Sequence, residues 1–313
     1  GAKPVEMQST GSLAQSPARW AVAGDIQTEY GIVKIGTGLD VALDKRVIRI
    51  NGQNVRAQSM LAEYVSCVWL TPQMDGLFLD GASERRRFFD RLVFTFDPGH
   101  SGRVTRYENA MRQRSKVLQE SGDMVWVQAL EAQMAETGVA IAAARLDFIE
   151  RLQAACVQAR SAYFPMALIT CDGHVEEILR RSSALEAESI FAYQLQEARG
   201  RDAITGGAHV GPHKSDFAVK YADKNMAAAQ CSTGEQKALL IGIILAHARL
   251  MKAECGRAPI LLLDEVAAHL DEERRAALYD LLADLRGQVW VTGTDESLFE
   301  AISDKAQFFT VDQ

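Results

Sequence analysis

The hydrophobic and polar positions follow three different patterns along the chain. From Trp20 to about Ala57, short apolar stretches are separated by turn residues, which is typical of antiparallel strands. Within this region, Asn51-Gly52 predicts a tight type I′ hairpin turn. Residues 64–70 are rich in β-branched and aromatic side chains and stop at Thr71-Pro72, so we expect a buried strand that ends at the proline.

Residues 98 to about 200 carry apolar side chains at helical spacing. We expect long helices over 104–120 and 123–160, and a shorter preceding helix capped by Ser83. There is little strand signal here apart from Ala167–Thr170, which runs into an Asp-Gly turn. The pattern therefore predicts a mostly helical insertion, because the strands on either side of it must belong to another unit.

From Val210 onward, strand and helix patterns alternate. The expected elements are a strand over Phe217–Tyr221, a helix capped by Ser232 or Thr233 and ending at Gly256, a strand over Ile260–Leu263, a helix over 271–285, a strand over 288–292, a short helix near Ser297 and a last strand near Phe308. The wholly apolar run of Ile260–Leu263 is typical of a parallel strand buried on both faces. The order predicts an α/β fold with a parallel sheet covered by helices.

Composition and charge limit the class of protein. The 313 residues are 48% hydrophobic and 24% charged, which is ordinary for globular domains. The net charge of −7 argues against a constitutively basic coat for nucleic acid. The sequence has no apolar run long enough for a membrane span, so we expect a cytoplasmic protein with no membrane partner. Five scattered cysteines without a CxxC spacing argue against disulfides and zinc.

One segment departs from the acidic average. Residues 84–120 contain nine Lys or Arg and five Asp or Glu, which gives a local charge of +4. Such a patch can contact phosphates of DNA without reading bases, although a solvated helix face is an equally ordinary explanation for any single residue. The candidates for DNA contact are Arg85, Arg103, Arg106, Arg112, Arg114 and Lys116.

Two carboxylates follow the buried strand near the end of the chain. Asp264 and Glu265 come directly after Ile260–Leu263. At the end of a parallel strand, an Asp can hold hydrated Mg²⁺ against nucleotide phosphates, and the next Glu can orient a water molecule. The plainer alternative is a pair of acidic residues that suits the dipole of the following helix.

A second motif changes the balance between these alternatives. Ser232-Thr-Gly234-Glu235-Gln236-Lys237 opens a predicted helix, where backbone N–H groups and a glycine can admit a phosphate. The same residues also form an ordinary capping box. After Asp264, a second acidic loop ends at Asp271. In this order, the three features resemble the signature motif, Walker B motif and D-loop of an ABC-type ATPase head.

A narrower resemblance rests on three further segments. Gly211-Pro212-His213-Lys214-Ser-Asp216 looks like the Gly-Pro-His-Arg/Lys-x-Asp element of the RecF family. Thr71-Pro72 followed by residues 81–90 is similar to that family's Pro-x-x-Arg-Arg-x-Phe-Leu-Asp segment, and Val291–Asp295 matches its threonine-rich strand end. The resemblance covers the chain from about Val22 to its end. It implies an ATPase head in two parts, 1–97 and 204–313, interrupted by a helical domain at 98–203.

The family resemblance also implies roles for single residues. Two heads sandwich two ATP molecules, so Ser232, Gly234 and Gln236 would serve the γ-phosphate bound by the partner subunit. Asp264 would hold Mg²⁺ and Glu265 would orient the attacking water. Gln73 is a candidate for the loop that links Mg²⁺ to the helical part, although the family tends to have an acidic residue there. Thr292 or Thr294 stands where other ABC proteins have a switch histidine.

The resemblance further implies a phosphate-binding loop, Gly-x₄-Gly-Lys-Ser/Thr (Walker A), ahead of all these motifs, and the 313 residues contain none. Gly207–Ser215 comes nearest, but Pro and His follow its second glycine and it lies beside the signature helix, so it is rejected. We expect a family member without its first strand, P-loop and helix. Such a chain should bind ATP poorly and lack the weak DNA-stimulated ATPase activity expected of the intact protein.

These features lead to one main functional hypothesis and two alternatives. A RecF-like protein would be a recombination mediator that dimerises with ATP and Mg²⁺, binds single-stranded/double-stranded DNA junctions, and with RecR and RecO helps load RecA in DNA repair, replication and the SOS response. The alternatives are the ATPase subunit of a transporter and a nonenzymatic DNA-binding scaffold. The helical insertion and the element at Gly211–Asp216 argue against the transporter.

Overall fold

The computed structural model describes residues 20–28, 31–40, 45–55, 58–120 and 122–311. The chain divides into two compact units, Gly1–Ser66 and Cys67–Gln313, and each is described by itself. The predicted division into 1–97, 98–203 and 204–313 stays a prediction.

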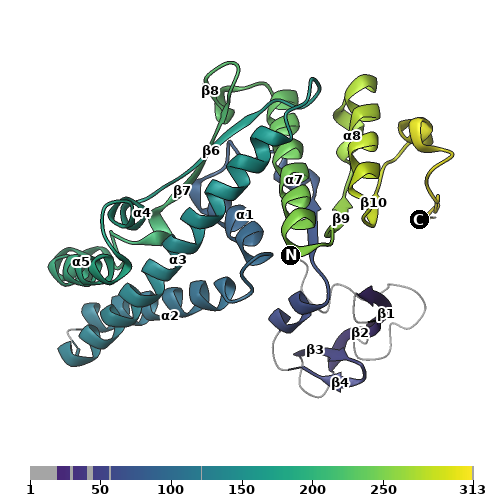
Figure 1. The fold of residues 1–313 in the computed structure, drawn as a ribbon. Coiled ribbons are helices and arrows are strands. Elements are labelled where there is room, and N and C mark those ends of the chain that lie inside the picture. Colours follow the sequence, from purple (N-terminus) through teal and green to yellow (C-terminus); the bar gives the residue numbers. More distant parts are fainter. Residues whose placement is uncertain (1–19, 29–30, 41–44, 56–57, 121, 312–313) are drawn as a thin grey trace. The chain divides into compact units, whose positions relative to one another are not determined.

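The first unit contains an antiparallel sheet in the order β1-β2-β3-β4 (Figure 1). Its strands are β1 (Ala21–Thr28), β2 (Gly31–Asp40), β3 (Lys45–Ile50) and β4 (Gln53–Asn54). The turn between β3 and β4 is formed by Asn51 and Gly52, both with positive φ (50° and 82°), as a type I′ turn requires. The predicted antiparallel region is therefore confirmed, except that its expected end at Ala57 lies outside the described residues.

The second unit combines helices with two small sheets. Its helices are α1 (Ala82–Phe94), α2 (His100–Gln119), α3 (Met124–Gln158), α4 (His174–Leu179), α5 (Ala184–Glu197), α6 (Arg199–Thr205), α7 (Thr233–Cys255) and α8 (Glu272–Leu285). Its strands are β5 (Cys67–Leu70), β6 (Ala167–Asp172), β7 (Asp216–Tyr221), β8 (Met226–Ala227), β9 (Ile260–Leu263) and β10 (Val289–Val291). Across both units, short 3-10 helices cover Gln58–Glu63, Pro72–Met74, Pro212–Lys214, Ala228–Gln230, Val266–His269 and Glu296–Ile302.

The predicted parallel sheet is present as β10-β9-β5. Leu261 and Leu263 are buried against the main core, as expected for β9. The expectation that both faces of this strand are buried is wrong, because Leu262 is 40% exposed. Its register neighbours Trp69 and Trp290 are exposed as well, so one face of the described sheet carries a row of large apolar side chains.

The strand expected over 217–221 belongs to a different sheet. β7 pairs antiparallel with β6 and with β8, so it is not part of the parallel sheet. The cause is a partner distant in sequence: β6 lies inside the helical region and pairs with β7 along its whole length. Helix α1 packs on the same strand through Phe89 and Phe217, whose rings stack with centroids 4.7 Å apart.

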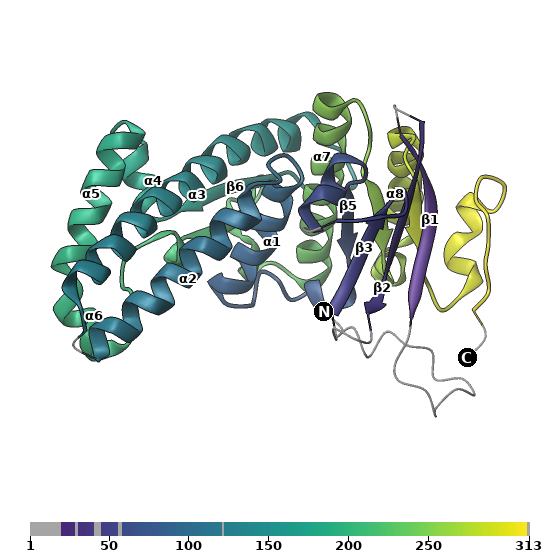
Figure 2. The same ribbon diagram turned by 90° about the horizontal axis from the view of Figure 1, so that it is seen from below.

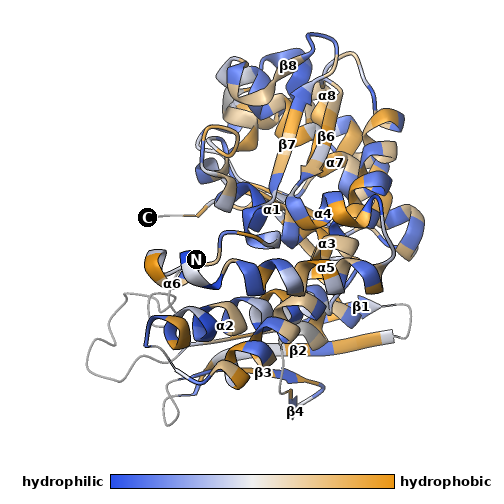
Figure 3. Ribbon diagram, turned by 90° about the vertical axis from the view of Figure 1, so that its left-hand side faces the viewer, coloured by the Kyte–Doolittle hydropathy of each residue, from blue (hydrophilic) through white to orange (hydrophobic). Residues whose placement is uncertain are grey.

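Helix α3 connects two hydrophobic clusters. Its first half, including Met134 and Ile141, packs with α2 and α5, and its second half, including Phe148 and Leu152, packs with α7 and the strands. Figures 1 and 2 both show α2 running beside α3. The surface helices carry hydrophobic and hydrophilic residues in alternation (Figure 3), as amphipathic helices do.

Local signals predicted some element ends correctly and others not. Ser232 is the N-cap of α7 with a complete capping box, and Gly256 ends that helix in the left-handed conformation, as expected. The expected cap at Ser83 is wrong, since Gly81 is the N-cap and α1 begins at Ala82. The expected last strand near Phe308 is absent from the described residues 303–311.

Candidate functional site

The predicted acidic pair lies where the parallel strands end. The Asp264 N–H donates to the Leu70 carbonyl at the end of β5 (2.9 Å), and the Thr292 N–H donates to the Leu263 carbonyl at the end of β9 (3.0 Å). Asp264, Glu265 and Thr292 therefore meet at one sheet edge. In open α/β sheets, the carboxyl ends of the strands are where ligands bind.

One hydroxyl group holds this arrangement together. Thr292 Oγ1 donates to Asp264 Oδ1 (2.6 Å) and accepts from the Glu265 backbone N–H (3.1 Å). Of the two predicted threonines, Thr292 makes the contact, whereas Thr294 is exposed beyond β10. Within the described part of the chain, the second carboxylate oxygen of Asp264 has no hydrogen-bond partner. Thr292 thus fixes one oxygen of Asp264 and leaves the other for a ligand.

Glu265 adopts the left-handed backbone conformation (φ 51°, ψ 25°). For a residue with a side chain, this conformation costs on the order of 1 to 3 kcal/mol, and such strain persists only where the surroundings enforce it. Here the bond from Thr292 and the start of a 3-10 helix at Val266 hold the backbone in place.

The donor set suits a hydrated Mg²⁺ rather than a metal cage. Mg²⁺ keeps several of its waters and takes one or two carboxylates together with substrate phosphates. Over the residues that the structure describes, no group of three or more His, Cys, Asp or Glu side chains converges. Asp264 therefore fits a cation that is shared with a nucleotide.

The signature turn is a capping box whose outer side is open. Ser232 Oγ accepts from the Glu235 N–H, and the Glu235 carboxylate accepts from the Ser232 N–H (2.9 Å). An ion pair with Lys224 and these Ser232 bonds lower the pKa of Glu235 to about 2. A Cβ at Gly234 would meet no atom within 4 Å, so a ligand can approach the backbone there.

Gln236, which is predicted to serve the γ-phosphate bound by the partner subunit, is turned inward in this structure. Its side chain is buried and donates from Nε2 to the Cys231 carbonyl (2.9 Å). It therefore holds the turn in shape in this conformation and does not face outward, because burial of an amide requires its hydrogen bonds to be satisfied internally.

Lys237 links the signature helix to the acidic pair. Its buried ammonium group lies 3.1 Å from Asp75 Oδ2 and 3.5 Å from the Glu265 carbonyl oxygen. Sequence reasoning selected Gln73, which is exposed in the 3-10 helix Pro72–Met74, and missed Asp75. A signal for Asp75 existed, since it is the first carboxylate after β5. Asp271, the predicted D-loop residue, is the N-cap of α8 and accepts from the Arg274 N–H (2.8 Å).

The two segments that carry the narrower resemblance are in contact. Arg85 of α1 forms a two-point ion pair with Asp216 (2.8 and 2.7 Å). Its neighbour Arg86 donates to the Ser215 carbonyl (2.7 Å). These contacts join two segments that lie about 130 positions apart in the sequence. The paired arginines of α1 are explained by these contacts with Ser215 and Asp216.

A buried arginine extends this network to α3. Arg145 donates to both carboxylate oxygens of Asp90 (2.8 Å each) and to the Pro212 carbonyl (2.7 Å). Burial opposes ionisation of Asp90, but hydrogen bonds from His100 and Arg145 lower its pKa to about 2. Asp90 is therefore ionised in the folded protein and binds Arg145 and His100. These contacts explain why a carboxylate follows the arginine-rich part of α1.

Gly211 and His213 fix the backbone of the same element. Gly211 has φ 137°, and a Cβ there would overlap the Tyr107 hydroxyl, so only glycine fits. His213 Nε2 lies 2.9 Å from the Ala208 carbonyl, and Nδ1 lies 2.8 Å from the Tyr107 hydroxyl. Because a carbonyl only accepts, we assign the proton to Nε2 and let Nδ1 accept from Tyr107. Burial lowers the pKa of His213 to about 4, so the ring is neutral near pH 7.

Arg114, one of the predicted DNA contacts, is not accessible to a ligand in this structure. Its side chain is fully buried and pairs with Glu131 (3.0 Å) and Asp202 (2.7 Å). It follows Tyr107 and Ala110 at helical spacing, so it belongs to the buried face of α2. That spacing was visible in the sequence and could have excluded it.

The other five predicted DNA contacts fall into two groups. Arg85 is held by Asp216 and Arg103 by Asp97, and their side chains are only 18% and 23% exposed. Both are therefore committed to structural ion pairs. The candidates that remain exposed on α2 are Arg106, Arg112 and Lys116.

None of the helices in the described ranges has the length and apolar composition needed to cross a bilayer. No profile of a known protein family matches the chain.

Comparison with known proteins identifies the family. The chain is 46% identical over 300 residues to the DNA replication and repair protein RecF of Rhizobium rhizogenes, an alignment that covers 95% of this chain and 80% of that protein. It is 48% identical over 287 residues to the protein of the same name from Mesorhizobium japonicum, covering 90% and 76% of the two chains.

The fold agrees with this relationship. A solved structure described as the recombination mediator protein RecF-ATPrS in the RecFOR pathway superposes with a TM-score of 0.78 at 20% identity, over 90% of this chain and 76% of that one. A second structure, of RecF-ATP, gives 0.75 at 21% identity. The predicted fold class, an α/β ATPase head with an antiparallel part and inserted helices, is confirmed. Because the chain is 46% and 48% identical to these two relatives over most of both chains, the protein belongs to the family of the DNA replication and repair protein RecF.

Proposed function

We propose that this chain is the ATPase-head region of a cytoplasmic recombination mediator that binds DNA without sequence preference when ATP is bound. The related solved structures are named as recombination mediators of the RecFOR pathway with ATP or ATPrS. RecO and RecR are therefore the partner proteins, RecA loading is the downstream event, and junctions of single- and double-stranded DNA are the target. Repair, replication and the SOS response are the processes served.

The meeting of Asp264, Glu265 and Thr292 at one sheet edge carries the nucleotide part of the proposal. Asp264 holds Mg²⁺ and Glu265 orients the attacking water. When bound, ATP with Mg²⁺ supplies a γ-phosphoryl group whose negative charge can join two protein surfaces. This chain contributes the open turn at Ser232 and Gly234, and Gln236 keeps that turn in shape.

The open signature turn further supports a composite site. Ser232 is exposed, and a Cβ on Gly234 would meet no atom of the described chain within 4 Å, so the outer side of this turn is open. In the dimer, this turn faces the γ-phosphate that the partner subunit holds. Ser232 and Gly234 would then link the two subunits, because they would contact a γ-phosphate that the other subunit holds.

Lys237 supports communication between the two composite sites. It sits in the first turns of α7, and it contacts Asp75 and the Glu265 backbone of its own subunit. A shift of the signature turn on binding the partner's nucleotide is thus transmitted to the residue that orients water. Dimerisation and hydrolysis are coupled through this one side chain.

The test is ATP-dependent dimerisation of the full product of the natural gene, followed by analytical ultracentrifugation. We expect Asp264→Asn and Ser232→Arg to abolish the ATP-induced dimer. Ser183→Arg is a matched control, because Ser183 caps α5 with the same kind of capping box outside the site. Asp280→Asn is the control for Asp264, since Asp280 is exposed on α8. Unchanged dimerisation in both site variants would contradict the proposal and favour a nonenzymatic scaffold.

A further inference from the structure

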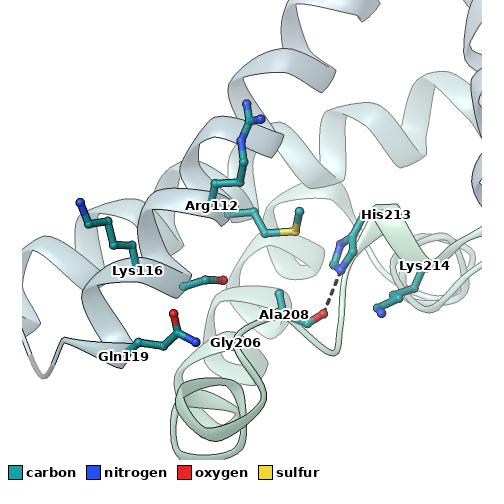
Figure 4. A pocket seen from close by; sticks show the side chains of 10 residues that line it. Arg112, Lys116, Gln119, Gly206, Ala208, His213 and Lys214 are labelled. Carbon is teal, nitrogen blue, oxygen red and sulfur yellow. Dashed lines mark hydrogen bonds between the residues drawn. The ribbon is translucent and has the colours of Figure 1, made fainter.

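A basic pocket lies between α2 and the segment that leads into the Gly211–Asp216 element (Figure 4). Its volume is about 400 Å³. Arg112, Ser115 and Lys116 of α2 form one wall, and Lys214 lies on the opposite side. No Asp or Glu lines the pocket, although the protein as a whole is acidic. The charge of the lining therefore favours an anion.

The pocket is built from segments that are held in place. Gly206 ends α6 in the left-handed conformation (φ 74°), with Gln119 of α2 beside it. On the other side, the backbone around Lys214 is fixed at both ends: Arg145 holds the Pro212 carbonyl and Arg86 holds the Ser215 carbonyl. The ammonium group of Lys214 is thus presented from a rigid base, which lowers the entropic cost of binding a ligand.

His213 lines the pocket but does not supply charge. Both of its ring nitrogens are engaged, with Tyr107 and with the Ala208 carbonyl. It supports the wall from which Lys214 projects. The anion-binding groups are therefore Arg112, Lys116 and Lys214.

The internal contacts of these three cations leave them available. Lys214 is exposed and has no ion-pair partner among the described residues. Lys116 lies 3.9 Å from Glu120, with both side chains well exposed, and Arg112 contacts only the amide of Asn109. Exposed pairs of this kind contribute little, so a phosphate can replace them. The buried carboxylate of Asp202 on α6 is paired with Arg114 and hydrogen-bonded to His209.

We propose that the DNA backbone lies along this pocket, with Lys214 contacting one phosphate and Arg112 and Lys116 contacting neighbouring phosphates. The inference rests on the proposed function, because it takes DNA as the ligand of this protein. Lys116 follows Arg112 by one helical turn, so both charges point to the same side of α2. Figure 4 shows the charged ends of Arg112 and Lys116 pointing away from Lys214, so the three cations suit successive phosphates of a backbone rather than a single one. Such contacts read no base, as sequence-independent binding requires.

The element Gly211–Asp216 thereby gains a function in addition to its structural one. Asp216, Ser215 and Pro212 anchor it to α1 and α3, and Lys214 is the exposed cation that it places at the pocket. Lys214 therefore differs from an ordinary surface lysine, because hydrogen bonds from Arg145 and Arg86 fix the backbone on both sides of it.

The test measures, by anisotropy, the binding of fluorescent junction DNA to the full product of the natural gene, with ATP and Mg²⁺, over a series of salt concentrations. Lys214→Gln and Lys116→Gln should each weaken binding to all DNA sequences alike and reduce the slope of log Kd against log salt by about 1. A slope change of this size means that the loss of affinity between 50 and 200 mM salt becomes about three- to four-fold smaller. Lys214→Arg should retain binding.

Lys220→Gln is the matched control, since Lys220 is an exposed lysine on β7 outside the pocket. Equal salt slopes for Lys214→Gln, Lys220→Gln and the unsubstituted protein would contradict DNA binding at this pocket. The proposed function would be unaffected by that result. Absence of DNA binding by the unsubstituted protein would instead overturn the proposed function. A third measurement compares the melting temperature of the protein with and without inorganic phosphate. If phosphate stabilises the unsubstituted protein but not Lys214→Gln, and Lys214→Gln binds DNA normally, the pocket binds a small anion. That result would contradict this inference.

Discussion

Arg85 and Asp216 form a two-point ion pair across 131 positions of sequence, with N–O distances of 2.8 and 2.7 Å. The pair joins α1 to the first residue of β7, and it closes the element that begins at Gly211. Two charge-assisted hydrogen bonds in fork geometry define orientation as well as distance. The relative placement of the two motif segments therefore depends on this contact.

We expect Arg85→Ala to lower the free energy of unfolding by about 1 to 2 kcal/mol, measured by urea denaturation. The loss is smaller than for a fully buried pair because the Asp216 side chain is 36% exposed and partly solvated. Arg87→Ala should change it by less than about 0.5 kcal/mol, since Arg87 pairs with Glu84 on an exposed surface. Equal losses in the two variants would show that the pair has no special role.

Arg114→Met should destabilise the protein by about 3 to 5 kcal/mol. The substitution leaves Glu131 and Asp202 buried without their shared cation, although Arg199 and His209 still contact them. Arg112→Met, two positions away and exposed, should leave the unfolding midpoint in urea nearly unchanged. A stable Arg114→Met variant with weakened DNA binding would contradict the structural role.

Gly211→Ala should cost about 2 to 4 kcal/mol of stability. Alanine is strained at φ 137°, and its methyl group would displace the Tyr107 hydroxyl from His213. Gly207→Ala, where a Cβ meets nothing within 4 Å, should cost far less. In a Tyr107→Phe background the hydroxyl overlap disappears, so a double-mutant cycle should show that Gly211→Ala costs less there. Strict additivity would exclude the overlap as the cause.

Stability should fall as the pH is lowered from about 6.5 toward 4. Burial lowers the pKa of His213 and His247 to about 4 in the folded protein, whereas an unfolded histidine titrates near 6.5. In this window the unfolded chain takes up protons that the folded state refuses, so protonation favours unfolding. Each histidine contributes at most about 1.4 kcal/mol per pH unit.

Urea unfolding at a series of pH values tests this expectation. Each single variant, His213→Asn and His247→Asn, should show a smaller pH slope than the unsubstituted protein. His247 is fully buried and contacts the Thr95 hydroxyl, so its variant also loses stability at neutral pH. A slope that is unchanged in both variants would assign the acid sensitivity to other groups.

Local sequence determined several features of this protein by itself. The turn at Asn51-Gly52, the start of α7 at Ser232 and its end at Gly256 follow from conformational preferences and caps within a few residues. The position of Asp264 and Glu265 follows from the apolar run before them. These predictions were correct because their energetics involve only neighbours along the chain.

Tertiary structure alone decided the rest. The helical spacing places Arg114 on the buried face of α2, but its pairing with two carboxylates from other helices is decided only by the fold. The antiparallel pairing of β7 with β6 and the contact of Lys237 with Asp75 likewise join distant segments. The burial and the charge pairing of a side chain depend on which elements meet in space. Contacts between distant segments form only in the folded chain, so local sequence does not reveal how much they stabilise it.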